Sequence, residues 1–63
     1  MQQHQERVVN ESNSLNERLT KLKSFLKTSA FYNLEEAERE RLKMQCGYMQ
    51  QYFDVLQERI NNF

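Results

Sequence analysis

The sequence has no proline and no tryptophan, and Gly47, Cys46 and His4 are the only residues of their kinds among 63. A lone cysteine excludes a disulfide within the chain, and one histidine far from one cysteine is not a zinc ligand set. Proline and glycine are the residues that most often interrupt helices, and here they are nearly absent. The sequence therefore predicts a chain that is helical almost throughout, with no metal site and no cofactor.

Long apolar runs are also absent. No stretch approaches the length of a membrane span, and the polar N-terminal residues do not resemble a signal peptide. A free cysteine is typical of a reducing compartment. These features predict a cytoplasmic protein with no membrane partner.

An excess of either charge is lacking too, because nine Lys and Arg balance nine Asp and Glu. A neutral chain has no general attraction to nucleic acid, so DNA is not an expected partner. The charges are nevertheless segregated. Cations concentrate in residues 18–27 and acids in residues 35–40.

The strongest pattern lies in the first half of the chain. Leu15, Leu19, Leu22 and Leu26 step by four, three and four, which places them on one side of a helix. Val8 extends this stripe toward the N-terminus, but Ser12 interrupts it. The pattern predicts a first helix over about residues 2–27.

The expected connection covers residues 28–33. Phe31 and Tyr32 are expected to fold back over the end of the hairpin. Asn33 followed by Glu36 is typical of a capping box, in which the two side chains satisfy free backbone N–H groups. This pattern predicts a second helix that begins at Leu34.

The second helix is predicted over about residues 34–60, with two apolar sets. The set expected to face the first helix has heptad spacing and comprises Leu42, Cys46, Met49, Phe53, Leu56, Ile60 and Phe63. The set expected away from it comprises Met44, Tyr48, Tyr52 and Val55. A two-helix hairpin covers only one of these sets. Gly47 either permits a close helix crossing or only weakens the helix.

These elements predict an all-α fold, a single domain over residues 1–63 made of an antiparallel two-helix hairpin. A chain this short buries a small core, and it has neither a disulfide nor a metal to stabilise it. Self-association is the remaining way to bury more surface. We therefore expect a homo-oligomer.

Groups for catalysis are not evident. A nucleophile needs a positioned base, and His4 and Cys46 have no spacing that pairs them. Cys46 falls in the apolar set that faces the first helix, where a small side chain packs. An enzyme is not expected.

The main functional candidates are Arg18 and Lys21, which are three residues apart and share one helix side. Such a pair is often only a solvated surface, but Arg can also grip two phosphate oxygens at once. Tyr32, Tyr48 and Tyr52 could stack on bases, although tyrosines at helical spacing more often pack. The pattern indicates an anion site that oligomerisation could complete.

Four short motifs, taken in order, resemble a known family of small crAssphage-related phage proteins, which includes the anti-CBASS cyclic-oligonucleotide sponges. They are His4-Gln5-x-Arg7-Val8-Val9-x-Glu11, Leu15-x-Glu17-Arg18-Leu19-x-Lys21-Leu22-x-x-Phe25, Phe31-x-x-Leu34-x-x-Ala37-Glu38 and Met49-x-x-Tyr52-x-x-Val55-Leu56-x-x-Arg59-Ile60. The resemblance covers nearly the whole chain.

The resemblance implies a binding protein. Such sponges hold the cyclic nucleotide signals of a bacterial antiphage system without cleaving them, so that the effector stays inactive. It also implies a helical homo-hexamer in the cytoplasm of an infected bacterial host. Cyclic dinucleotides would sit between paired protomers, and cyclic trinucleotides would use a separate site between subunits.

The resemblance also assigns residues. The family's phosphate-binding Lys corresponds to Arg18, which keeps the charge, and its trinucleotide site corresponds to Thr20 and Arg59. The family's N-terminal aromatic residue, which contacts the dinucleotide, corresponds to Gln3 or His4. Lys21 is added from its position beside Arg18, without support from the family.

Two other functions compete with this one. An RNA-binding helical hairpin that dimerises into a four-helix bundle, like plasmid copy-number regulators of similar length, would use the basic helix side. The neutral net charge argues against it. A structural or adaptor module with no small ligand would use only its apolar seam.

Overall fold

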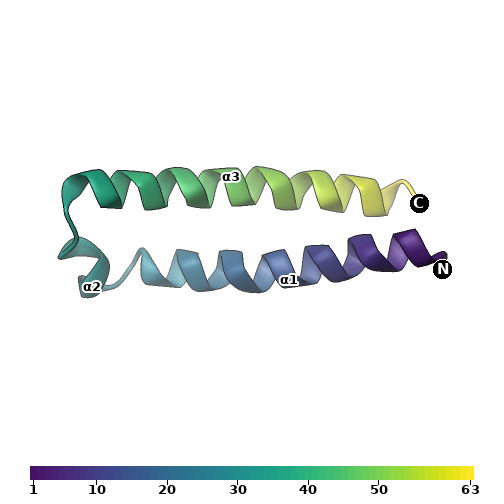
Figure 1. Ribbon diagram of the computed structural model, residues 1–63, viewed down its shortest axis with the longest axis horizontal. Coiled ribbons are helices and arrows are strands. Elements are labelled where there is room, and N and C mark those ends of the chain that lie inside the picture. The colour runs from purple at the N-terminus through teal and green to yellow at the C-terminus, as the bar shows by residue number, and fades with distance from the viewer.

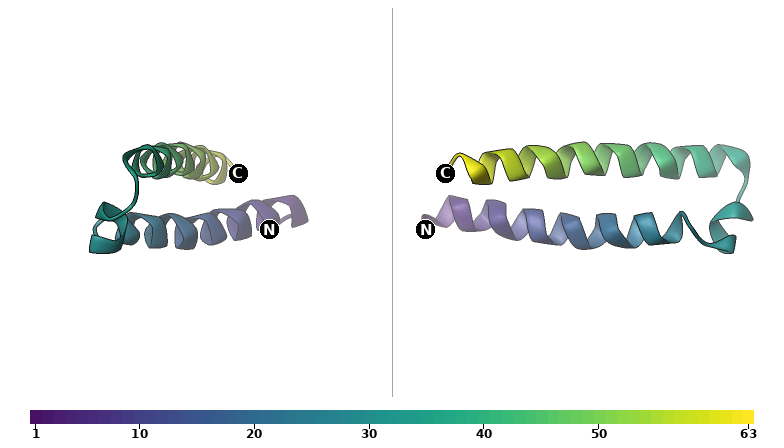
Figure 2. Two further views of the ribbon diagram at one scale, coloured as in Figure 1. Left: turned by 60° about the vertical axis from the view of Figure 1, so that its left-hand side comes forward. Right: turned by 180° about the vertical axis from the view of Figure 1, so that it is seen from behind.

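Two long helices and one short helix make up the computed structural model, which describes residues 1–63. They are α1 (Gln3–Phe25), α2 (Ser29–Tyr32) and α3 (Glu36–Asn61). Figure 1 shows α1 and α3 side by side and antiparallel, with both termini at one end and α2 at the other. The views in Figure 2 agree with this arrangement. The chain is a rod of 46 × 14 × 13 Å, and the expected all-α architecture of two packed long helices is confirmed.

The connection begins where Thr28 adopts extended backbone, with φ −95° and ψ 158°. Its hydroxyl donates to the backbone oxygen of Phe25 over 2.7 Å and accepts from the backbone N–H of Phe31 over 3.2 Å. One side chain thus closes α1 and caps α2. As a result, α1 ends at Phe25, two residues before the expected end.

The predicted capping box at Asn33 and Glu36 is wrong. Asn33 is the C-cap of α2, and its backbone N–H donates to the Ser29 oxygen over 3.0 Å. Asn33 has αR backbone, with φ −84° and ψ −6°, and it lies two residues before Glu35, which is the N-cap of α3 and makes no side-chain cap. Helix α3 therefore begins at Glu36, two residues later than expected. Arg39 holds this bend instead.

Arg39 acts as a clamp across the bend. Its Nη1 donates to the backbone oxygens of Tyr32, over 3.0 Å, and Leu34, over 2.7 Å. Tyr32 is the last residue of α2 and Leu34 lies between α2 and α3, so neither carbonyl has a following helical turn to supply its donor. A side chain from the second turn of α3 therefore fixes how the hairpin turns.

The core is thin, as expected for one helix packed on another. Val8, Leu15 and Leu56 form its buried centre, and Met49, Phe53 and Ile60 pack against them half-buried. Leu19 is also buried, and Leu42 and Cys46 are half-buried. Phe63 does not belong to this set: it is 48% exposed because α3 ends at Asn61.

Ser12, the weak point of the apolar stripe, is one of the most buried residues of the chain. Its Oγ accepts a hydrogen bond of 2.6 Å from Nε2 of Gln57. Burying a hydroxyl is unfavourable unless it is paired, and Gln57 provides that partner from the opposite helix. This bond also specifies the register of α1 against α3.

The hairpin end is covered by one of the two expected aromatic residues. Phe31 is buried and packs edge-on against Phe25, with ring centroids 6.1 Å apart. Tyr32 stays 65% exposed, because its ring lies outside Phe31 at a centroid distance of 5.3 Å. Only Phe31 closes the core at this end.

Replacing Thr28 by Ala is expected to lower the free energy of unfolding by about 1 kcal/mol, the usual cost of losing such a cap. The substitution removes both hydrogen bonds of the hydroxyl while the side chain itself is exposed. Thermal unfolding followed by circular dichroism measures the change. Thr28→Ser keeps the hydroxyl and should stay close to wild type, so equal losses in both variants would contradict the capping role.

Gly47→Ala is expected to stabilise the isolated hairpin by up to about 1 kcal/mol, the difference in helix propensity. Gly47 lies inside α3, and an added Cβ would meet nothing within 4 Å. Within one chain, therefore, Gly47 makes no close crossing. Chemical denaturation checks the prediction, and a destabilised variant would show that another chain packs against this position.

Candidate anion-binding groove

A groove between α1 and α3 contains the residues that the sequence indicated most strongly. We call it the basic groove. Its volume is about 480 Å³, and it is lined by Leu15, Arg18, Lys21, Leu22, Gln45, Met49 and Tyr52. This volume lies within the range of small-molecule sites, about 300–1,000 Å³. The lining contains two cations and no carboxylate, so the groove favours an anion.

Arg18 and Lys21 come together because residues three apart on a helix share one side. Both side chains are exposed at the rim of the groove. The two salt bridges of the chain, Arg41 with Glu38 and Lys43 with Glu40, lie on α3 and involve neither residue. Their donors are therefore available to a ligand.

The other cations of residues 18–27 point elsewhere. Lys23 Nζ donates to Oε1 of Gln50 over 2.7 Å and so ties α1 to α3 outside the groove. Lys27 lies beyond the end of α1 and does not line the groove either. The basic stretch in the sequence thus separates into one pair at the groove and cations that serve other surfaces.

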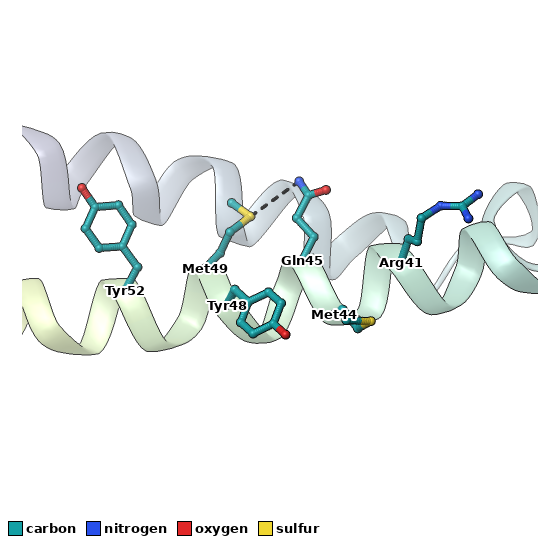
Figure 3. A pocket seen from close by; sticks show the side chains of 6 residues that line it. All are labelled: Arg41, Met44, Gln45, Tyr48, Met49 and Tyr52. Atoms are coloured by element: carbon teal, nitrogen blue, oxygen red, sulfur yellow. Dashed lines mark hydrogen bonds between the residues drawn. The ribbon is translucent and has the colours of Figure 1, made fainter.

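The opposite wall comes from α3, through Gln45, Met49 and Tyr52. In Figure 3 these side chains extend from α3 toward α1, and Gln45 Nε2 contacts the Met49 sulfur at 3.9 Å. Tyr52 is 43% exposed, so its ring has a free surface. Next to two cations, the wall offers a flat aromatic group and an amide.

The sequence did not predict that this wall faces Arg18 and Lys21. It placed Met49 in the seam and Tyr52 in the apolar set away from the first helix, although it named Tyr52 among the tyrosines that could stack on bases. Tyr52 follows Met49 by three residues, so it lies beside the seam rather than opposite it. That offset is the signal that could have identified it as a groove residue.

The remaining predicted site residues do not line the basic groove. Gln3, His4, Thr20 and Arg59 are all exposed. Gln3 and His4 lie in the first turn of α1, about 20 Å along the helix from Arg18. Thr20 follows Arg18 by two residues, which turns it to the opposite side of α1.

Thr20 and Arg59 are also far from each other within one chain. The Ser12–Gln57 hydrogen bond sets the antiparallel register. Thr20 lies eight residues from Ser12 toward the hairpin end, and Arg59 lies two residues from Gln57 toward the termini. Together these offsets separate them by about 15 Å along the rod. Within one chain, therefore, these two residues do not form one compact site.

A second, shallower hollow runs along the outside of α3. Its volume is about 550 Å³, and it is lined by Arg41, Met44, Gln45, Tyr48, Met49 and Tyr52 (Figure 3). Gln45, Met49 and Tyr52 also line the basic groove. The two hollows are therefore parts of one continuous surface, basic on the α1 side and apolar on the outside of α3.

The lining of the basic groove offers two cations, an amide and an aromatic ring. The groove holds no histidine, cysteine, serine or carboxylate, and no group of His, Cys, Asp and Glu side chains could hold a metal ion. Cys46 is a half-buried thiol in the seam. No helix carries a stretch apolar and long enough to span a bilayer.

The family model described as Sequestin matches residues 2–62, which is almost the entire chain. This agrees with the resemblance to cyclic-oligonucleotide sponges seen in the motifs. Searches of curated proteins and of solved structures give no match.

Proposed function

Because this chain belongs to the Sequestin family, we propose that it binds cyclic oligonucleotide second messengers and sequesters them without cleavage. Cyclic di- or trinucleotides held in this way would not reach the CBASS effector that they activate. The protein would then act as a phage anti-defence protein in the cytoplasm of an infected bacterial host. It would be a sponge and not an enzyme.

The observation that carries the proposal is the basic groove, where Arg18 and Lys21 face an open hollow with no carboxylate. A cyclic oligonucleotide presents phosphates around a ring with flat bases outside it. Charge-assisted hydrogen bonds from Arg and Lys suit the phosphates. The free surface of Tyr52 across the groove suits a base, because aromatic side chains stack on bases of any sequence.

The proposed ligand also explains why only two cations per chain line the basic groove. A protein that binds long nucleic acid contacts many phosphates and usually has a basic surface over a wide area. A cyclic dinucleotide has only two phosphates, which two cations per chain can match. The neutral overall charge is compatible with this small ligand.

We further propose that the working form is a homo-oligomer, with a hexamer as the expected state. Thr20 and Arg59 would then come from different chains to form a trinucleotide site, since they are far apart within one chain. Gln3 and His4 would contribute to dinucleotide binding from the N-terminal turn of α1, where His4 could stack on a base.

A melting-temperature screen tests the proposed function. The purified protein is heated with cyclic di-AMP, cyclic di-GMP or cyclic tri-AMP, with linear dinucleotides as controls. A ligand that binds only the folded state adds about 2.7 kcal/mol at a hundredfold excess over its Kd. We expect a clear rise in Tm with at least one cyclic ligand, and the ligand should be recovered intact after the protein is denatured.

Two results would contradict the proposal. If none of the cyclic ligands raised the Tm, Arg18 and Lys21 would be surface cations without a ligand. Recovery of a linear or cleaved product would indicate an enzyme. A parallel titration with hairpin RNA at two salt concentrations tests the RNA-binding alternative, which predicts binding that falls steeply with salt.

A further inference from the structure

Gln45 is the one amide side chain among the residues that line the basic groove. It is exposed, and its only hydrogen bond is the 3.9 Å contact from Nε2 to the Met49 sulfur. A thioether is a weak acceptor, and Oε1 of Gln45 accepts no hydrogen bond within the chain. The amide therefore keeps both a donor and an acceptor available to a ligand.

Two other glutamines of α3 are used within the fold. Gln50 accepts a hydrogen bond of 2.7 Å from Lys23 and donates one of 2.9 Å to Asp54. Gln57 donates to the buried hydroxyl of Ser12. The amide in the basic groove has no such partner, so the packing of the two helices does not depend on it.

Gln45 and Tyr52 form the two ends of the α3 wall. Seven residues separate them, which is about 10 Å along the helix. Arg18 and Lys21 lie six and nine residues past the α1 partner of the hydrogen bond that sets the register, so they lie opposite positions 51 and 48 of α3. The groove thus has cations along its middle, an aromatic ring at one end and an amide at the other (Figure 3).

This order of groups matches the shape of a cyclic dinucleotide. Its phosphates lie in the central ring, and one base extends on each side. With the phosphates at the cations, one base reaches Tyr52 and the other reaches Gln45. A tyrosine ring stacks on any base. An amide distinguishes between bases, because it has one acceptor and one donor side by side.

We infer that Gln45 determines base specificity in the basic groove, where its amide reads the edge of one base and favours adenine over guanine. This inference rests on the proposed function. Adenine presents a donor at N6 beside an acceptor at N7, which a glutamine amide matches with two hydrogen bonds. Guanine presents two acceptors, O6 and N7, at the same edge. Guanine matches the amide only at its other edge, through N1–H and O6, whereas adenine matches it at both.

Wild-type protein should therefore bind cyclic di-AMP more tightly than cyclic di-GMP. A base contact with two hydrogen bonds discriminates by about 5- to 150-fold. Because Gln45 is exposed to water, we expect the lower end of this range, about five- to tenfold. Cyclic GMP-AMP should bind almost as tightly as cyclic di-AMP, since one adenine is enough. Isothermal titration calorimetry measures the three Kd values, and a Kd for cyclic di-GMP equal to or below that for cyclic di-AMP would overturn the inference.

Gln45→Glu tests the reading of the base directly, because a carboxylate only accepts hydrogen bonds. Guanine has two neighbouring donors, N1–H and N2–H, whereas adenine has only its N6 amino group. The added negative charge should weaken the binding of both ligands. The ratio of their Kd values should nevertheless shift toward cyclic di-GMP by at least about fivefold.

Gln51→Glu is the matched control. It adds the same charge at an exposed position of α3 that lines neither hollow, so it should keep the wild-type ratio of Kd values. Both substitutions exchange one good helix former for another. An unchanged ratio in Gln45→Glu, or an equal change in both variants, would overturn the specific role of Gln45.

An NMR measurement on the wild-type chain remains decisive even if Gln45→Glu does not fold. Each glutamine side chain gives its own pair of amide signals in a two-dimensional proton–nitrogen spectrum. The pair that is missing from the spectrum of Gln45→Met belongs to Gln45, and Gln51→Met identifies the pair of Gln51 in the same way. Saturating cyclic di-AMP should shift the signals of Gln45 and leave those of Gln51 in place. Bound ligand with no shift at Gln45 would overturn the contact.

These outcomes separate the inference from the proposed function. If no cyclic nucleotide binds, both are rejected. If cyclic nucleotides bind tightly but the ratio of their Kd values does not change with the residue at position 45, the protein is a sponge and its base preference does not come from this amide.

Discussion

Arg18→Ala is expected to weaken the binding of cyclic nucleotides by about 10- to 150-fold, which corresponds to the 1.5–3 kcal/mol of a charge-assisted hydrogen bond. Arg18 is an exposed cation of the basic groove and takes part in no salt bridge within the chain. If two copies hold one ligand, the loss occurs twice and the effect is larger. Isothermal titration calorimetry with cyclic di-AMP measures the change in Kd.

Matched variants separate the role of Arg18 from that of charge in general. Arg18→Lys keeps the charge but loses the two-pronged geometry, so its loss should be intermediate. Lys27→Ala removes one cation outside the groove and should bind almost as wild type. If Arg18→Ala instead disrupted the oligomer in sedimentation, Arg18 would be a structural residue. Wild-type binding by Arg18→Ala would reject the groove as the site.

Leu56→Ala is expected to cost about 2–5 kcal/mol in the free energy of unfolding, the usual range for a buried leucine. Leu56 is 1% exposed at the centre of the core cluster. A chain below about 70–80 residues rarely has more than about 3–5 kcal/mol of stability from a single core. The substitution should therefore unfold the hairpin at ordinary temperatures unless a partner chain compensates.

Circular dichroism with urea titration measures this loss. Phe63→Ala is the control, since it deletes a larger apolar side chain that is 48% exposed beyond the end of α3. Substitutions at such surface positions usually change stability by less than about 0.5 kcal/mol. A Leu56→Ala protein as stable as the Phe63→Ala protein would show that the seam between α1 and α3 does not carry the fold.

The two long helices were predictable because their information is local. The near-absence of Gly and Pro and the repeat from Leu15 to Leu26 depend only on neighbours along the chain. The positions where the helices begin and end were harder to predict. Thr28 and Arg39 determine them through side-chain hydrogen bonds to backbone groups three to seven residues away, whereas the capping pattern favoured Asn33.

Only the α1 side of the candidate site was predictable from the sequence, because only that side depends on neighbours along one helix. Arg18 and Lys21 lie three apart on one helix, so their pairing follows from helix geometry. Tyr52, Met49 and Gln45 reach them only because α3 folds back in one register. That register depends on contacts such as the Ser12–Gln57 hydrogen bond across 45 positions of sequence.

By itself, then, the sequence determined an all-helical chain, the apolar side of each helix, the pair of cations on α1 and the motifs of a sponge family. Helical periodicity and composition are properties of short segments, so they need no partner. Tertiary structure decided the burial of Ser12, the tyrosine across the groove and the apolar side chains left exposed on the outside of α3. These depend on which two surfaces meet, and that choice is made by packing between segments far apart in the chain.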